Sequence, residues 1–371
     1  MLCVAALSSF RLPATTTPRA GSYTPHRPAR NNCTLGSHDI FGGRSSSGLA
    51  LCRASAFLSA AQESYESSDE AGASSARVSA LYRYPVKSGR PEAIAHATVT
   101  SEGFQGDRRF MVTTAGGGYQ TQREQPSLAT LEATVDEARG LLLLRAGRAR
   151  LNVTIQQRGA AVQATLFGDR LDLVDQGAEV SRWLSEVLLH GGSGFDVRRV
   201  WPMLRTPAFR LLHASESGPG ESGPGAVLPR STPGAGLSDA APLLLICEET
   251  LAALNARRAA QGRAPVPMSR FRPNLVASTC GGAHAEDLWR TVRIGTSATF
   301  RVVGPCPRCT VPDVDQQTGI RDSLGAGPMQ TLRGYRSRAA RGVLFGIYLA
   351  PMTVGTNVRV GDAIQVTSRA P

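Results

Sequence analysis

Two cysteines flank a proline and an arginine in GPCPRCTVPDVD, residues 304–315. The side chains of this segment are the ones in the sequence best suited to chemistry. Arg308 lies between Cys306 and Cys309, and a guanidinium beside a thiol lowers the pKa of that thiol. The resulting thiolate is a good ligand for a soft metal at neutral pH. One cysteine is then enough as the protein ligand, and a bound cofactor would supply the remaining coordination.

Three other interpretations of these cysteines stay open. A thioredoxin-like redox pair needs a helix that begins at the cysteines, and the following TVPDVD, with its proline and alternating valines, is not typical of one. A tetrahedral zinc site would combine Cys280 and His284 with Cys306 and Cys309. In the last alternative the two cysteines are buried and bind nothing.

The elements that must position this segment are mostly short strands. Apolar runs of strand length, separated by Gly, Pro, Asp or Asn, fill residues 76–205 and 237–369. This spacing predicts a mainly β chain of the barrel or sandwich type, with few helices. The clearest helices are expected at 177–190 and 248–260, and a flexible linker with a repeated ESGPG is expected at 206–236.

The N-terminal stretch has a different composition. Residues 1–62 contain six arginines and a single acidic residue, Asp39, among many Ser, Thr, Ala and Pro. Such a stretch is typical of an organelle transit peptide, so we predict that 1–75 is a disordered targeting segment. The abundance of hydroxylated residues favours the chloroplast over the mitochondrion, and a plain disordered tail is the alternative.

Charge and cysteine usage limit the classes of function. The net charge is +12, but only 6% of residues are aromatic and the basic residues are dispersed, so we expect no nucleic-acid partner. No apolar run approaches the roughly 20 residues of a transmembrane helix, so none is expected. The cysteines after residue 75 do not form the pattern of a disulfide scaffold, and a reducing compartment fits them.

Five motifs occur in a fixed order along residues 80–368. They are Tyr84-Pro85-Val86-Lys87-Ser88, Asp107-Arg108-Arg109-Phe110, Phe271-Arg272-Pro273-Asn274, Ala285-Glu286-Asp287-Leu288-Trp289, and Cys306-Pro307-Arg308-Cys309 with the later Asp315 and Thr318-Gly319. On these motifs the chain resembles the MOSC family, named after the C-terminal domain of molybdenum-cofactor sulfurases. Within that family it looks most like the amidoxime-reducing components of mitochondria.

The resemblance implies a MOSC N-terminal β-barrel domain at 76–205 and a MOSC β-barrel domain at 237–369. It also implies a molybdenum cofactor, in which a pterin presents a dithiolene to the metal and a phosphate to the protein. Cys309 matches the protein ligand of the molybdenum. The positions that match contacts to the phosphate and pterin are Lys87, Ser88, Arg108, Arg272, Asn274 and Arg308. Asp313 or Asp315 could relay protons, and Asp315 is the preferred candidate of the two, although the sequence favours a loop-capping role for either.

Lys87 is the only lysine of a chain with 41 lysine and arginine residues. Lysine presents a compact charge on a slender stem, whereas arginine presents a broad planar fork. If Lys87 reaches the phosphate or pterin through a narrow gap, a guanidinium would not fit there. The survival of one lysine by chance is the alternative, and Arg108 and Arg272 can equally be arginines that stabilise strands.

The implied activity is the reduction of small N-hydroxylated substrates, with electrons from a cytochrome b5-like protein and its reductase. The alternative is a carrier of sulfur or of the cofactor. The complete sulfurases carry an additional pyridoxal-phosphate domain, which we do not expect here, and so we expect no desulfurase activity. One departure from the family is the segment Ser238-Asp239-Ala240-Ala241-Pro242, which lacks the hydroxyl residues that relatives often carry at 240 and 241.

Overall fold

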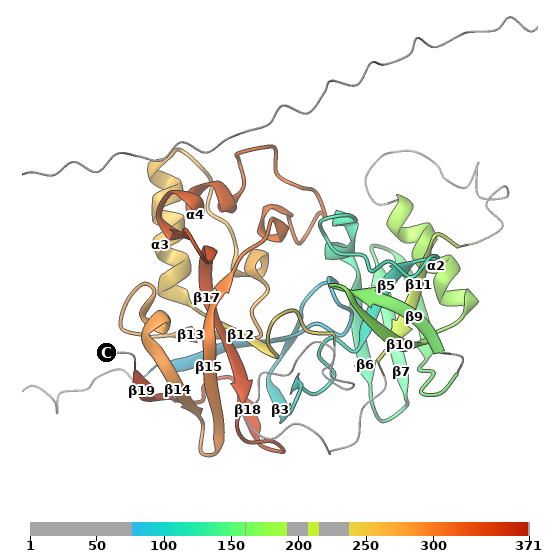
Figure 1. The fold of residues 1–371 in the computed structure, drawn as a ribbon, viewed down its shortest axis with the longest axis horizontal. Helices are drawn as coiled ribbons and strands as arrows, with labels where there is room; N and C mark the ends of the chain where they lie inside the picture. Colours follow the sequence, from blue (N-terminus) through green and yellow to red (C-terminus); the bar gives the residue numbers. More distant parts are fainter. Residues whose placement is uncertain (1–75, 160, 191–206, 215–236, 370–371) are drawn as a thin grey trace, which may run out of the picture. The chain divides into compact units, whose positions relative to one another are not determined.

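The structure is a computed structural model that describes residues 76–159, 161–190, 207–214 and 237–369. Within these ranges the chain is mainly β, as the sequence predicts, and Figure 1 shows that its few helices lie beside the sheets. The stretch 1–75, predicted as a transit peptide, lies outside the described residues. None of the helices in the described ranges combines the length and the apolar character that crossing a membrane requires.

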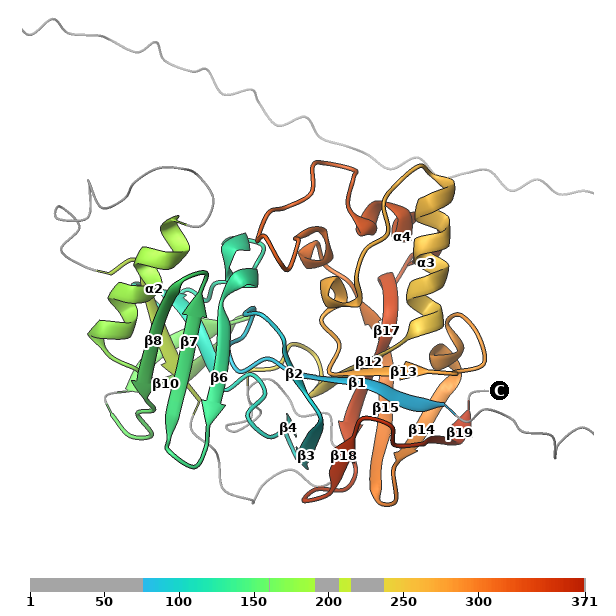
Figure 2. The same ribbon diagram turned by 180° about the vertical axis from the view of Figure 1, so that it is seen from behind.

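The largest sheet contains nine strands. They are β1 (Arg77–Arg83), β2 (Glu92–Ile94), β12 (Leu243–Cys247), β13 (Leu275–Ser278), β14 (Trp289–Ile294), β15 (Ala298–Pro307), β16 (Ser337–Arg338), β17 (Gly342–Pro351) and β19 (Ile364–Arg369). Their order is β19-β14-β15-β17-β12-β13-β1-β2, and β16 pairs with β17 (Figure 2). Strands from both β-rich stretches therefore share one sheet, since β1 and β2 come from the first stretch.

The two ends of this sheet approach each other without completing a barrel. Hydrogen bonds from Val78 N to Asp362 O and from Ile364 N to Ala76 O join the start of β1 to the residues around the start of β19. The second half of β1 pairs instead with β2. The ladder described for these strands is therefore open, whereas the resemblance implied a closed barrel.

The uninterrupted apolar sequence of β12 follows from burial on both faces. All five residues of Leu243–Cys247 are buried. Leu243, Leu245 and Cys247 belong to one core, while Leu244 and Ile246 pack into a second core, as expected for side chains that alternate across a sheet. A central strand of this kind carries no polar face, so its sequence shows no alternation.

Helices α3 (Glu248–Ala260) and α4 (Pro328–Arg336) contribute to the second core. Helix α3 connects β12 to β13, and these two neighbouring strands are parallel, which requires a crossover of this length. Its first turn carries Glu248 and Glu249 and its last turn carries Arg257 and Arg258, an arrangement that complements the helix dipole.

The remaining strands form three small sheets. They are β5-β11-β10-β9, β18-β3-β4 and β6-β7-β8. Their bounds are β3 (His96–Thr100), β4 (Gly103–Phe104), β5 (Phe110–Thr114), β6 (Glu132–Asp136), β7 (Leu141–Ala146), β8 (Ala149–Thr154), β9 (Ala161–Leu166), β10 (Asp169–Asp175), β11 (Phe209–His213) and β18 (Asn357–Arg359). Helix α2 (Ala178–His190), close to the predicted 177–190, packs with several of them in a separate core.

The predicted linker at 206–236 contains one strand. β11 pairs with β5 and β10, so residues 209–213 belong to a sheet of the first β-rich stretch. Residues 215–236 lie outside the described residues. Leu237 lies a few residues before β12, and its backbone oxygen accepts a hydrogen bond from Lys87.

Candidate functional site

Lys87 is held in the loop that follows β1. Its backbone N donates to Phe110 O at 2.7 Å, and its side chain is buried, with 3% of the residue exposed. The ammonium donates to Leu237 O at 2.8 Å and to the carboxylate of Asp239, and it lies 5.2 Å from the centre of the Phe167 ring. Burial lowers the pKa of Lys87, while Asp239 acts in the opposite direction. Two of the three ammonium protons thus have partners, which leaves one for a ligand.

Arg108 and Arg272 both lie over the ring of Tyr84. Their guanidinium carbons are 5.4 Å and 4.4 Å from the centre of the buried Tyr84 ring. Arg108 is paired with Asp107 at 2.9 Å, whereas Arg272 donates to Gly89 O at 2.7 Å and forms no ion pair among those of the described residues. Burial lowers the pKa of Arg272 to about 10. We call Lys87, Arg108 and Arg272, with Asp107 and Asp239, the cationic cluster.

The backbone around the cationic cluster is unusual. Six non-glycine residues in the described ranges have a positive φ, a conformation that L-residues adopt at a cost and that tends to occur at functional sites. Four of the six belong to or contact this cluster: Ser88 (φ 67°), Arg108 (φ 48°), Phe167 (φ 54°) and Arg272 (φ 56°). Three of these four are residues that the sequence predicts for cofactor binding.

Asn274 lies beside the cluster and is fully buried. Its amide oxygen accepts hydrogen bonds from Leu244 N at 3.2 Å and from Arg108 Nη1 at 3.4 Å, and its amide nitrogen donates to Tyr82 O at 3.3 Å. The side chain therefore ties Arg108 to β12 and to β1. In this geometry Asn274 orients a cluster residue and presents no surface of its own.

The two cysteines of the CPRC segment have different environments. Cys306, at the end of β15, is buried, whereas Cys309 is exposed, and both are free thiols. Arg308 donates to the Cys306 sulfur at 3.1 Å and to Phe271 O at 2.7 Å. Because Phe271 directly precedes Arg272, this second bond connects the CPRC segment to the cationic cluster. The Arg308 Nε is buried without a partner in the described part of the chain.

Charged neighbours of Cys309 come from both β-rich stretches. Partial burial acts in the opposite direction, but the charge of Cys309 contributes to raising the pKa of Arg123, and it acts in the same way on Arg308. Tyr348 on β17 adjoins Cys306, Arg308 and Asp239, and burial together with Cys306 raises its pKa. The exposed thiol thus has two cations in its electrostatic environment, Arg123 and Arg308.

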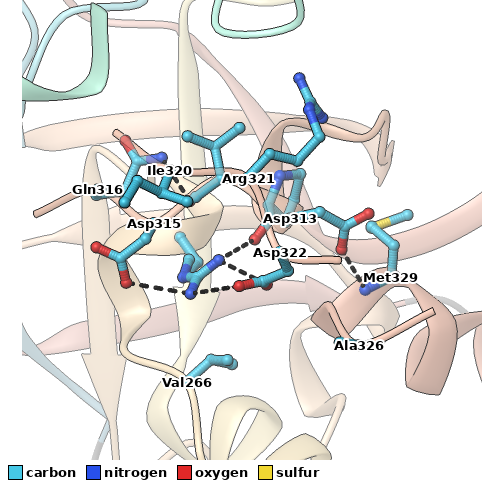
Figure 3. A network of polar contacts seen from close by, with 12 residues as sticks. Val266, Asp313, Asp315, Gln316, Ile320, Arg321, Asp322, Ala326 and Met329 are labelled. Carbon is cyan, nitrogen blue, oxygen red and sulfur yellow. Dashed lines mark hydrogen bonds and ion pairs between the residues drawn. The ribbon is translucent and has the colours of Figure 1, made fainter. Parts of the chain in front are cut away.

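Asp315 caps its own loop. One carboxylate oxygen accepts from Gln317 N and Thr318 N, each at 2.9 Å, and the other accepts from Arg270 at 3.1 Å. Burial works against ionisation, but these hydrogen bonds and Arg270 hold the pKa of Asp315 below its usual range. Arg270 also binds Asp322 at 2.8 Å, and we call these contacts the Arg270 network; Figure 3 shows its two carboxylates, Asp315 and Asp322. The geometry favours the loop-capping role for Asp315 over proton relay.

Asp313 has a different environment. It is the first acidic residue after Cys309, it is half-buried, and burial raises its pKa. Its carboxylate accepts from Met329 N at 3.0 Å, at the start of α4. Asp313 thus has a structural role at a helix end, as Asp315 has in its loop.

The zinc alternative is wrong for the part of the chain that the structure describes. Cys280 forms a disulfide with Cys247, and the His284 ring lies against Tyr335 instead. The thioredoxin-like alternative lacks its helix, because η6, a 3-10 helix at Val311–Asp313, follows the cysteines. The disulfide itself was not expected from the sequence, which gave no reason to pair Cys247 with Cys280.

Comparison with known proteins agrees with this geometry. The model of the MOSC N-terminal beta barrel domain matches residues 75–190, and that of the MOSC domain matches residues 233–365. The mitochondrial amidoxime-reducing component 1 of Mus musculus is 30% identical over 302 residues, which cover 77% of this chain and 81% of that protein. The chain belongs to the MOSC family.

Two further proteins show a weaker similarity to this chain. The molybdenum cofactor sulfurase of Solanum lycopersicum is 29% identical over 76% of this chain, but only 34% of that protein is covered. The YUAD protein of Bacillus subtilis has a solved structure, with 10% identity and a TM-score of 0.29 over 78% of this chain. That score is too low to support an argument from the structure.

Several residues of this MOSC chain were missed at the sequence level. They are Tyr84, which packs against two arginines, Asp107 and Asp239, which pair with cluster cations, and Phe167, which lies over the ammonium. Asp239 could have been found, because it lies in the SDAAP segment that matches the family.

Proposed function

We propose that this protein binds the molybdenum cofactor through the cationic cluster and Cys309 and uses it to reduce N-hydroxylated compounds. The observation that carries the proposal is the charge balance of the cluster. Three cations, Lys87, Arg108 and Arg272, share two carboxylates, in a site where burial disfavours an unpaired cation. An anion with several oxygens, such as a phosphate, would restore the balance.

The residues present fit such a cofactor. Arg308 has a buried Nε without a partner among the described residues, Lys87 has one free ammonium proton, and Cys309 is an exposed thiol in a cationic environment. Soft thiolate suits a molybdenum ion, and cationic donors suit the phosphate end of a pterin. When bound, the cofactor would supply the redox chemistry that cleaves an N–O bond, with two electrons and two protons consumed and one water released.

Each residue predicted for the site has its own role in this proposal. Lys87, Ser88 and Arg272 would bind the anionic end, and Asn274 would hold Arg108 in position for the same ligand. Cys309 would bind the metal, and the positive charge of Arg308 would stabilise negative charge close to it. Asp315, which its loop holds ionised, would contribute through the loop and not as a proton donor.

The similarity to proteins named amidoxime-reducing components supports the substrate class. Electrons would come from a cytochrome b5-like protein and its reductase. The same relatives are named mitochondrial, which supports an organelle location and gives no support to the predicted preference for the chloroplast. A test is turnover of an aromatic amidoxime by protein made in a host that synthesises the cofactor. Formation of the corresponding amidine with a chemical one-electron donor is expected, and its absence with fully loaded protein would contradict the proposal.

One observation favours a second function, that of a sulfur carrier. Cys309 is an exposed thiol next to an arginine, which is an environment in which a persulfide can be held and transferred. The similarity to the sulfurases is compatible with that role. Metal-free protein that releases thiocyanate on treatment with cyanide would support the carrier, and molybdenum-loaded protein without such sulfur would support the enzyme.

A further inference from the structure

A second group of metal-binding side chains lies away from Cys309. Among the described His, Cys, Asp and Glu residues, only Cys247, Glu249 and Cys280 bring three possible ligand atoms within 4.8 Å of one another. Cys247 is the residue before helix α3, Glu249 is in its first turn, and Cys280 follows β13. None of these residues takes part in the proposed cofactor site.

The carboxylate of Glu249 suggests that the group has a use beyond the disulfide. One of its oxygens is fixed, because it accepts from Cys280 N at 2.9 Å. The other is buried and has no partner in the described ranges. A buried carboxylate oxygen without a partner is costly, and a disulfide beside it offers no hydrogen-bond donor. A cation at this position would remove that cost.

The chemistry of the ligand set is suited to zinc. Thiolate ligands bind Zn²⁺ at about 2.3 Å and carboxylate oxygens at roughly 2.1 Å, so two ligands of a tetrahedral ion lie roughly 3.6 Å apart. Ligand atoms that all lie within 4.8 Å need only a small adjustment to reach this spacing. The N-terminus of α3 lies at Cys247 and favours the thiolate form.

An entry path exists on one side of the group. Gly281, Gly282 and Ala283, directly after Cys280, are exposed. Both glycines have a positive φ, and neither has an atom within 4 Å of the position where a Cβ would be. This short loop can therefore admit a hydrated ion to sulfurs that are otherwise buried.

We propose that Cys247, Glu249 and Cys280 bind one Zn²⁺ when the disulfide is reduced, with water as the fourth ligand. A dithiol reductant opens the bond by thiol–disulfide exchange: the disulfide gains two electrons and two protons, and the reductant becomes a disulfide. Zn²⁺ then displaces the two thiol protons. The disulfide and the zinc dithiolate exclude each other, because each state uses both sulfurs.

The experiment uses full-length protein in which four of the five other cysteines have been replaced. The background variant carries serine at Cys3, Cys33, Cys52 and Cys309. After reduction and removal of the reductant without air, Zn²⁺ is titrated against a chromophoric chelator. We expect one equivalent of tightly bound Zn²⁺ in the reduced protein and none in the oxidised protein. No uptake by the reduced protein, or equal uptake by both forms, would overturn the proposal.

Two variants and one spectrum identify the ligands. In this background Cys280→Ser should abolish competition with the chelator, and Glu249→Gln should weaken binding at least tenfold. Retained affinity in either variant would contradict the site. Because Cys280→Ser can impair folding, Cd²⁺ is also added to the reduced background protein, where the intensity of the thiolate charge-transfer band should correspond to two sulfurs per cadmium. Intensity for one sulfur or none would exclude the site.

Discussion

Arg270 and Arg272 are separated by one residue, yet they belong to two charge clusters with different balance. In the Arg270 network one guanidinium binds two carboxylates, those of Asp315 and Asp322. In the cationic cluster Arg272 shares two carboxylates with two further cations, Lys87 and Arg108. The first arrangement needs no ligand, because anions outnumber the cation. The second contains three cations and only two carboxylates.

The backbone shows the same difference. Arg272 has a φ of 56° and ends the 3-10 helix η4 (Met268–Phe271), whereas Arg270 lies inside that helix and is not among the residues with a positive φ. Backbone strain is retained where a function requires it and is otherwise costly. The comparison therefore separates a group of charges that holds a loop from a group that is prepared for an anion.

The first prediction breaks the Arg270 network. Arg270→Ala leaves Asp315 and Asp322 without their buried partner. We therefore expect the free energy of unfolding to fall by about 3 kcal/mol. Molybdenum bound per folded molecule should stay unchanged. Denaturant unfolding and metal content are the measurements. Arg293→Ala, which removes an exposed side chain bonded to Gln365, is the control and should change stability by less than about 0.5 kcal/mol.

The second prediction breaks the cationic cluster. Lys87→Met removes a buried charge that the ligand needs, so pterin retention should fall at least about thirtyfold, which corresponds to about 2 kcal/mol. Lys87→Arg restores the charge but not the slender shape, and we expect pterin retention to fall in this variant as well. Cofactor retained by Lys87→Arg at the wild-type level would show that only charge matters, and retention by Lys87→Met would remove Lys87 from the site.

The third prediction concerns the dependence of stability on pH. It decides over which pH range variants of the two clusters can be compared. His213 is 4% exposed, and burial and Arg109 lower its pKa to about 4. The unfolded chain, with a histidine pKa near 6.5, binds the proton first, so stability is lost as the pH falls from about 6.5 to 4. Between pH 7 and pH 5 this loss is about 2 kcal/mol. His213→Phe should reduce it, and an unchanged pH profile would contradict the assignment.

The fourth prediction concerns the strain at Ser88. Ser88→Gly removes a side chain from a residue with a φ of 67°, so the free energy of unfolding should rise by about 0.5–1 kcal/mol. The same change removes the hydroxyl proposed to bind the anion, so pterin retention should fall severalfold. Thermal unfolding and pterin fluorescence measure the two effects. A loss of stability would show that the left-handed backbone at Ser88 is not strained.

Much of the fold was predictable because burial leaves a pattern in the sequence. Strands such as β12 and β17 are apolar runs, and α2 and α3 were expected within a few residues of their bounds. The strands β10 and β11 and the helix α4 were not predicted. β10 alternates charged with apolar residues in a short hairpin, and β11 lies next to a low-complexity stretch, so neither resembles an isolated strand. Helix α4 contains Gly334 and begins at a proline, and its pairing with α3 is a tertiary effect.

Residues of the candidate site could be predicted from the sequence only where they belong to a family motif. Lys87, Arg108 and Arg272 were expected from their motifs, and the structure brings them together. The partners Asp239 and Phe167 come from distant segments, and no local pattern indicates which carboxylate or ring will meet a buried ammonium. The disulfide between Cys247 and Cys280 could not be predicted for the same reason, since 33 residues separate them.

The central claim is that Cys309 binds the metal of a cofactor held by the cationic cluster. The most direct measurement is the molybdenum and pterin content of wild-type protein and of Cys309→Ala, both made in a host that synthesises the cofactor. We expect near-stoichiometric molybdenum in the wild type and only background molybdenum in the variant, while the cofactor-free forms of both should have the same thermal stability because Cys309 is exposed. Wild-type protein without molybdenum and pterin, or a variant that keeps its molybdenum, would contradict the account.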